Sequence, residues 1–224
     1  MLIRKSISVA HRTALEEIAR PGTWLDGWTR NQVILESRHS KDCALCLSRK
    51  KALSPYAIDG LHDTVSDLPI DYIEVIHRIS SDSGRLTQSW FNRLRPKMPA
   101  EVYIELLGII ACGVIMDTFA EGTGQELSPP LKARQGEPSR ITNPNVIDAG
   151  AWLPILDVKN VPSNTGLPST PNIARALGLV PTAIDLFFKV MRKHYSLSDM
   201  DFDLSRDQTE MLAARVSSLN QCFY

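Results

Sequence analysis

Apolar side chains recur at helical spacing along most of this chain of 224 residues. Two segments place four apolar residues at i, i+3, i+4 and i+7: Tyr72, Val75, Ile76 and Ile79, and Ile184, Phe187, Phe188 and Met191. This spacing is typical of one buried face of an α-helix. Because the pattern is helical nearly throughout, the sequence predicts an all-α fold.

Helix boundaries follow from local signals. Pro55 should end one helix before Ser54, because a proline ring disfavours helix in the preceding residue. Gly122 and Gly124 are stop signals for the longest helix. The expected helices cover residues 6–19, 28–37, 43–53, a segment after Pro69, 87–94 and 100–121, with further helices opening at Pro181 and at Ser205.

The helix that opens at Ser205 begins with a capping box, Ser205-Arg206-Asp207-Gln208. We expect Leu212, Val216 and Leu219 to form its buried side. Asn220 could then cap a following helix that begins near Cys222.

Prolines divide the chain. Eight of the 14 prolines lie between Pro129 and Pro171, in a stretch without sustained periodicity. Trp152 and Leu153 within it predict that the stretch packs over a surface. A loop of this length favours a boundary between two units. We therefore predict an N-terminal helical unit over 1–125, an irregular connector over 126–170 and a C-terminal unit over 171–224.

Charge and composition narrow the classes of function. Lys+Arg and Asp+Glu both total 25, so no overall field attracts nucleic acid or an anionic membrane. The first residues lack the apolar core of a secretory signal. The most hydrophobic stretch, Leu106 to Met116, is shorter than the ~20 residues that span a bilayer. We expect a cytoplasmic protein, in which a Cys-x-x-Cys motif is more often catalytic or metal-binding than a structural disulfide.

Cys43-Ala44-Leu45-Cys46 is such a motif at an expected helix start. Unpaired backbone N–H groups there favour the nucleophilic thiolate. A thiolate attacks a peroxide or a disulfide, and its neighbour resolves the product into an internal disulfide. We favour this redox role over an inert pair or a metal site, since structural zinc usually takes four ligands and only His39 lies at a ligand-like spacing.

The remaining cysteine and histidine candidates have simpler interpretations. Cys112 lies within an apolar run and should be a core residue. His77 sits beside a buried stripe, which favours a structural role, whereas His62 follows Gly60 in a short break and is more open. Without other information, Glu210 is interpreted as an ordinary carboxylate on a helix surface.

The C-terminal segment carries a longer phrase. It consists of Pro171 to Leu177, Pro181, and the run from Gln208 through Glu210, Val216-Ser217 and Asn220 to Cys222-Phe223-Tyr224. This pattern resembles the AhpD-like alkylhydroperoxidase / carboxymuconolactone decarboxylase superfamily. Members of that family typically have a glutamate followed by the motif Val-Ser-x-x-Asn-x-Cys-x-x-Cys-x-x-x-His. The resemblance implies an AhpD-like helical bundle, usually oligomeric, that reduces peroxides with a cysteine pair and a glutamate proton relay and without a bound cofactor.

By position, the resemblance makes Glu210 the relay carboxylate and Cys222 the resolving cysteine. Tyr224 stands where some members have a relay histidine, and the attacking residue would be position 225. The second repeat would then be incomplete. One explanation is a selenocysteine codon read as a stop, and the other is a true early terminus.

The first half resembles a diverged copy, as in duplicated alkylhydroperoxidase-related proteins, some of them selenoproteins. Cys43 and Cys46 match the cysteine pair, Asn31 replaces the glutamate and Lys50 replaces the histidine. The expected function is therefore a thiol- or selenol-dependent peroxidase, using a hydroperoxide and an unknown thiol reductant, homo-oligomeric and impaired in this chain. The alternatives are a non-catalytic helical protein that shares only the fold, or a carboxymuconolactone-decarboxylase-like enzyme.

Overall fold

Helices form the framework of the computed structural model, which describes residues 3–160, 170–195 and 203–219. They are α1 (Lys5–Ile18), α2 (Gly27–His39), α3 (Ala44–Lys51), α4 (Ile70–Asp82), α5 (Gln88–Leu94), α6 (Ala100–Thr123), α7 (Asn172–Ala176), α8 (Pro181–His194) and α9 (Arg206–Leu219). Across these ranges the β-structure is one short antiparallel pair, β1 (Val146–Ile147) and β2 (Ile155–Leu156). The all-α prediction is confirmed. An AhpD-like bundle and an internal repeat remain predictions.

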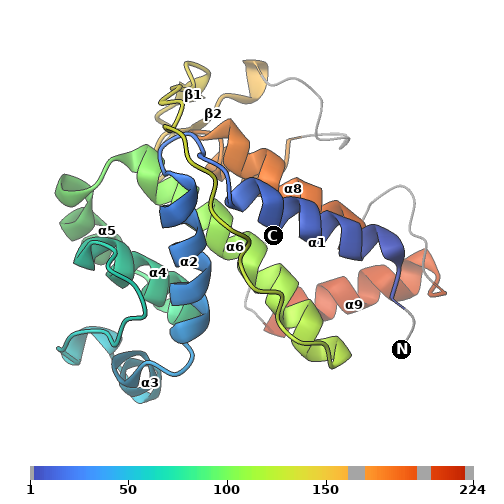
Figure 1. Ribbon diagram of the computed structural model, residues 1–224, viewed down its shortest axis with the longest axis horizontal. Helices are drawn as coiled ribbons and strands as arrows, with labels where there is room; N and C mark the ends of the chain where they lie inside the picture. Colours follow the sequence, from blue (N-terminus) through green and yellow to red (C-terminus); the bar gives the residue numbers. More distant parts are fainter. Residues whose placement is uncertain (1–2, 161–169, 196–202, 220–224) are drawn as a thin grey trace.

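Helix α6 is the centre around which the others pack. Helices α2 and α4 contact it on one side, and α8 together with α1 covers another (Figure 1). A Cβ added at Gly108 would lie 2.7 Å from the Cβ of Ala183, so this glycine lets α8 approach α6 closely. By length and composition α6 could cross a membrane, but 67% of its most apolar window is buried, as in the core helix of a globular protein.

The local signals predicted several helix ends correctly. The backbone N–H of Gln208 donates to Ser205 Oγ at 3.3 Å, and the N–H of Ser205 donates to Gln208 Oε1 at 2.9 Å, which completes the capping box. Gly124 ends α6 in the left-handed conformation, with φ 68°. Pro181 occupies the first turn of α8.

The predicted buried side of α9 is wrong. Leu212, Val216 and Leu219 are 50%, 56% and 67% exposed, and Thr209 is the buried residue of this helix. The side of α9 that faces the molecule carries Thr209 and Glu210, and Glu210 Oε2 accepts the Tyr195 hydroxyl at 2.9 Å. The stripes on α4 and α8 behave as predicted, since Val75, Ile76 and Phe187 are buried and their other members pack against the core.

The proline-rich connector packs on the turn between α1 and α2. The backbone N–H of Arg134 donates to Ala19 O at 2.7 Å, and that of Arg140 donates to Thr23 O at 2.8 Å. Leu153 and Leu156 are buried. Side chains of α8 belong to the same core cluster as those of α1, α2, α4, α5 and α6. The division at 125 and 170 stays a prediction.

Two histidines join α1 to α8. The Nε2 atoms of His11 and His194 are 2.7 Å apart, and the ring of Phe119 meets His194 edge-on with centroids 4.9 Å apart. One ring must donate to a bare nitrogen of the other, so at least one histidine is neutral. Burial, with the nearby charges of His11 and Arg4, lowers the pKa of His194 to about 4. Burial also lowers the pKa of His11, against the opposing effect of Asp117.

This pair makes stability depend on pH in a defined window. An unfolded histidine binds a proton below about pH 6.5, whereas folded His194 resists protonation until about pH 4. The contribution of His194 to stability should therefore be constant above pH 6.5 and fall as the pH drops toward 4. We expect a loss of about 1–2 kcal/mol, allowing for the partial exposure of the ring. Urea unfolding across this range should show a smaller acid loss in His194→Gln and an unchanged one in the neighbouring Lys193→Gln. Equal slopes in all three proteins would contradict the assignment.

Candidate metal centre

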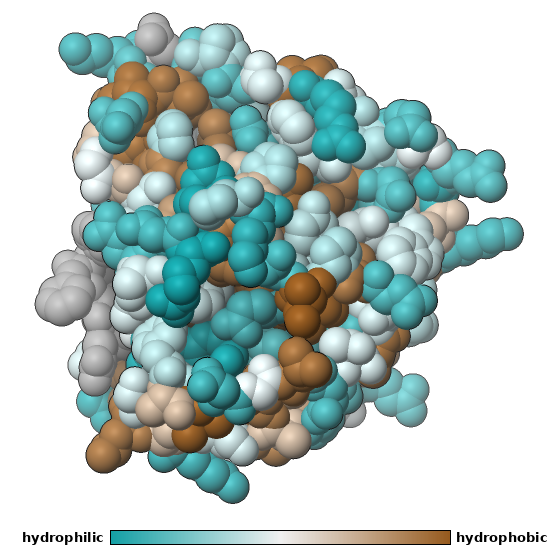
Figure 2. Space-filling model, turned by 90° about the vertical axis from the view of Figure 1, so that its left-hand side faces the viewer, coloured by the Kyte–Doolittle hydropathy of each residue, from teal (hydrophilic) through white to brown (hydrophobic). Residues whose placement is uncertain are grey.

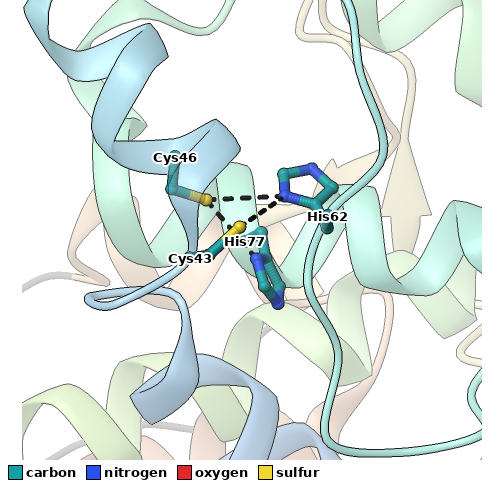
Figure 3. Close-up of side chains that lie close together, drawn as sticks. All are labelled: Cys43, Cys46, His62 and His77. Atoms are coloured by element: carbon teal, nitrogen blue, oxygen red, sulfur yellow. Dashed lines mark hydrogen bonds between the residues drawn. The ribbon is translucent and has the colours of Figure 1, made fainter.

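Four potential metal ligands meet beside α3. Cys43 caps the N-terminus of α3, Cys46 lies in its first turn, and His77 projects from α4. His62 comes from the irregular segment between a short 3-10 turn, η1 (Pro55–Ala57), and α4. One ligand atom of each side chain lies within 4.8 Å of those of the other three (Figure 3). The side chains therefore converge on one point from three separate segments.

The distances match those of a tetrahedral metal site. His62 Nδ1 lies 3.4 Å from Cys43 Sγ and 3.5 Å from Cys46 Sγ. His77 Nδ1 lies 3.4 Å from Cys46 Sγ. A tetrahedral zinc ion, with Zn–S about 2.3 Å and Zn–N about 2.0–2.1 Å, separates its sulfur and nitrogen ligands by about 3.6 Å. These three sulfur–nitrogen pairs could thus accept an ion with shifts of a few tenths of an ångström, and the other ligand pairs lie within 4.8 Å.

Each histidine is oriented by a carboxylate. His62 Nε2 lies 2.8 Å from Glu74 Oε2, and His77 Nε2 lies 3.0 Å from Glu36 Oε2. In the neutral ring that a metal ion binds, an N–H at Nε2 that donates to the carboxylate leaves Nδ1 bare and directed at the sulfurs. Histidines that bind metals almost always donate their other ring N–H in this way, which fixes the tautomer and raises the basicity of the ligand.

Glu36 also holds the segment that carries His62. This carboxylate is fully buried between α2 and α4. Its Oε1 accepts the backbone N–H of Val65 at 2.9 Å and the hydroxyl of Ser66 at 2.5 Å. A single side chain therefore positions His77 and anchors the chain three residues after His62.

Polar contacts fix both ends of α3. Asp63 Oδ2 accepts the backbone N–H of Ala44 at 2.9 Å, which satisfies one free donor at the N-terminus. At the C-terminus the guanidinium of Arg85 donates to the carbonyls of Arg49 and Ala52 at 2.9 and 2.7 Å. These contacts set where the first turn begins, and with it the direction of both cysteine side chains.

In the metal-free site the pKa values of Cys43, His62 and Glu74 are all shifted toward their charged forms. Burial alone would raise the pKa of Cys43, but hydrogen bonds from the Cys46 backbone and from His62 outweigh it and lower this pKa. Burial opposes protonation of His62, yet Cys46, Glu74 and Cys43 together raise its pKa to about 10. Despite its burial, Glu74 has a pKa lowered to about 2 by His62, Trp90 and Arg49. The site thus favours thiolate and carboxylate on either side of the His62 ring.

The structure brings some of the predicted site residues together and not others. Cys43 and Cys46 face the same histidine and are free thiols. Glu210 lies on α9, where it accepts the Tyr195 hydroxyl, in a part of the molecule away from α3 (Figure 1). Cys222 and Tyr224 lie outside the described residues. Cys112 is buried in the core as predicted, and burial raises its pKa to about 12.

His62 and His77 complete a set that the sequence analysis did not assemble. Fifteen residues separate Cys46 from His62, and fourteen separate His62 from His77, unlike the closely spaced histidine pairs of zinc fingers. His39, whose spacing seemed more suitable, is not in the ligand set, and its ring centroid lies 6.1 Å from that of His77. Local sequence carried no signal for this set, because His77 meets its carboxylate partner Glu36 when α2 and α4 pack together.

Comparison of the chain with protein-family models, with curated proteins and with solved structures gives no match. The family resemblance of the C-terminal phrase therefore remains a prediction.

Removing the shared carboxylate should destabilise the fold. In Glu36→Ala the Nε2–H of His77, the N–H of Val65 and the hydroxyl of Ser66 lose a buried acceptor. Each unsatisfied buried donor costs about 1–3 kcal/mol, so we expect a total loss of about 3–5 kcal/mol in urea unfolding. Glu121→Ala removes an exposed ion pair with Lys41 and should cost less than about 1 kcal/mol. Similar losses in both variants would show that Glu36 does not hold the site together.

Proposed function

We propose that Cys43, Cys46, His62 and His77 bind one Zn²⁺ ion, which fixes the His62 segment against α2, α3 and α4. The observation that carries this proposal is the convergence of two sulfurs and two carboxylate-oriented Nδ1 atoms at sulfur–nitrogen distances of 3.4–3.5 Å. Two thiolates and two imidazoles suit Zn²⁺ and not Mg²⁺ or Ca²⁺, which prefer oxygen ligands.

The proposed ion has a structural role. Four protein ligands fill a tetrahedral coordination sphere, whereas catalytic zinc keeps a position open for water or substrate. Cys43, Cys46 and His77 are at most 3% exposed, so bulk water does not reach the ligands freely. The two thiolates neutralise the ion, and the Glu36 and Glu74 carboxylates balance the positive charge that zinc induces on the two rings.

Metal content tests this proposal. Protein produced with zinc in the medium should contain one zinc per chain, and Co²⁺ in its place should give the intense visible bands of a tetrahedral thiolate site. Cys46→Ser and His62→Asn should bind at least tenfold more weakly, and Glu74→Gln about 10–100-fold more weakly.

Two matched variants serve as controls. Cys112→Ala removes a cysteine that lies in the core, and His194→Gln removes a histidine of the α1–α8 pair. Both should keep full zinc content. Equal zinc affinity in all variants, measured by competition with a chelator, or no zinc in the wild type, would refute the site.

A second candidate function is thiol-dependent peroxide reduction by the metal-free pair. It is favoured by the position of Cys43 at the start of α3 and by the hydrogen bonds that lower its pKa. In this proposal one sulfur attacks the hydroperoxide and the other resolves the product, while Glu210 and Cys222 act in the second unit as the family resemblance implies. Zinc and disulfide formation compete for the same sulfurs, so bound zinc should slow the turnover.

Turnover by metal-free protein tests this candidate. With a dithiol reductant we expect slow consumption of hydroperoxide, which falls to background in a Cys43→Ser/Cys46→Ser double variant and persists in Cys112→Ala. The reason is that the hydroperoxide oxidises one of these sulfurs, the other closes the internal disulfide, and the dithiol reduces that disulfide. Unchanged turnover in the double variant would exclude this pair as the reactive site.

A further inference from the structure

We propose that a hydroperoxide oxidises Cys43 and Cys46 to a disulfide, which expels the zinc ion and releases the segment that carries His62. This inference rests on the proposed metal site and adds its regulation. The redox state of two side chains would then decide whether residues 58–64 are held against α3.

The sulfurs are the ligands that an oxidant can remove. They lie three residues apart at the start of one helix, and both contact the same atom, His62 Nδ1. The ligand atoms of the set are within 4.8 Å of one another, so joining the sulfurs at the disulfide distance of about 2.05 Å needs only local movement. A disulfide carries no charge and is a poor ligand for a divalent ion.

The chemistry balances without a further reactant. One thiolate attacks the hydroperoxide, which breaks the O–O bond, forms a sulfenic acid and releases an alkoxide that is protonated to the alcohol. The second thiolate attacks the sulfenic sulfur, forms the S–S bond and releases hydroxide, which is protonated to water. Two thiolates, one hydroperoxide and two protons give one disulfide, one alcohol and one water, and Zn²⁺ leaves with its charge unchanged.

The histidines cannot retain the ion alone. After oxidation two nitrogen ligands remain, and tetrahedral zinc takes four. Glu36 still binds the ring of His77, which helix α4 carries, so this histidine keeps its position in the absence of metal. His62 lies on an irregular segment and loses its link to α3 through the ion, keeping its contact with Glu74. Oxidation should therefore empty the site without unfolding the helices that surround it.

Apart from the sulfurs, the polar contacts of the segment around His62 with the described residues are those of His62 with Glu74, of Asp63 with the Ala44 N–H, and of the Ile58 carbonyl with Arg49. The segment forms no helix or strand, and its residues 59–61 and 63–65 are exposed while the His62 side chain points inward, only 4% exposed. Gly60 lies over Leu45, and Ile58 packs on the small cluster of Cys43, Leu45 and Cys46. Figure 2 shows the side of the molecule on which α3, α4 and α5 lie, where hydrophilic side chains gather across the middle and hydrophobic ones form separate patches. Release of the segment would expose Leu45 and add to that apolar surface.

Treatment of the zinc-loaded full chain with hydrogen peroxide or tert-butyl hydroperoxide tests the inference. A chromogenic chelator follows zinc, and digestion with trypsin follows the thiols, because Cys43 and Cys46 share one peptide, residues 42–49, without Cys112 or Cys222. We expect one zinc released per disulfide formed, a mass loss of about 2 Da in that peptide, and faster hydrogen exchange in residues 58–64. A dithiol reductant with added zinc should reverse all three.

The outcomes separate this inference from the metal site itself. If the purified chain takes up no zinc, the proposed function fails. If zinc binds but stays bound while the peptide remains reduced, the site stands and the redox inference is overturned. Release with sulfinic acid, with a bond to Cys222, or with loss of the helical circular dichroism would also overturn it. Cys112→Ala should behave like the wild type.

Discussion

The hydrogen bonds from His62 to Glu74 and from His77 to Glu36 are the contacts on which the site depends. They link three elements, α2, α4 and the segment before α4, and they turn both Nδ1 atoms toward the two sulfurs. Without these carboxylates the neutral rings could rotate or adopt the other tautomer, and an N–H in place of a lone pair would then face the metal position. The carboxylates therefore convert four nearby side chains into one set of donors with a shared direction.

The same geometry explains why two chemistries compete at α3. Thiolates next to an imidazole are good metal ligands and good nucleophiles, because both roles use the same sulfur lone pairs. Burial favours the ion, since Cys43 is fully buried and the four ligands enclose one point. Oxidation favours the disulfide, because it removes the negative charge that holds a cation.

The sequence predicted the helices well because their signals are local. The Ser205–Gln208 capping box, Gly124 and Pro181 each act within one turn, and the stripes on α4 and α8 report burial directly. The prediction of a buried side on α9 was wrong. A stripe of apolar residues shows that one face of a helix is apolar, but it does not show that the rest of the molecule covers that face.

The ligand set could not be predicted in the same way. His62 and His77 reach the cysteines only when α3 and α4 pack side by side and the intervening segment folds back. The spacings of fifteen and fourteen residues carry no trace of that packing. The local sequence did place Cys43 and Cys46 together, because three residues span less than one helical turn.

X-ray absorption at the zinc edge of the zinc-loaded protein tests the central claim most directly. Our account predicts a first shell of two sulfur atoms at about 2.3 Å and two nitrogen atoms at about 2.0–2.1 Å. A shell of nitrogen and oxygen atoms without sulfur, or four sulfurs drawn from more than one chain, would contradict it.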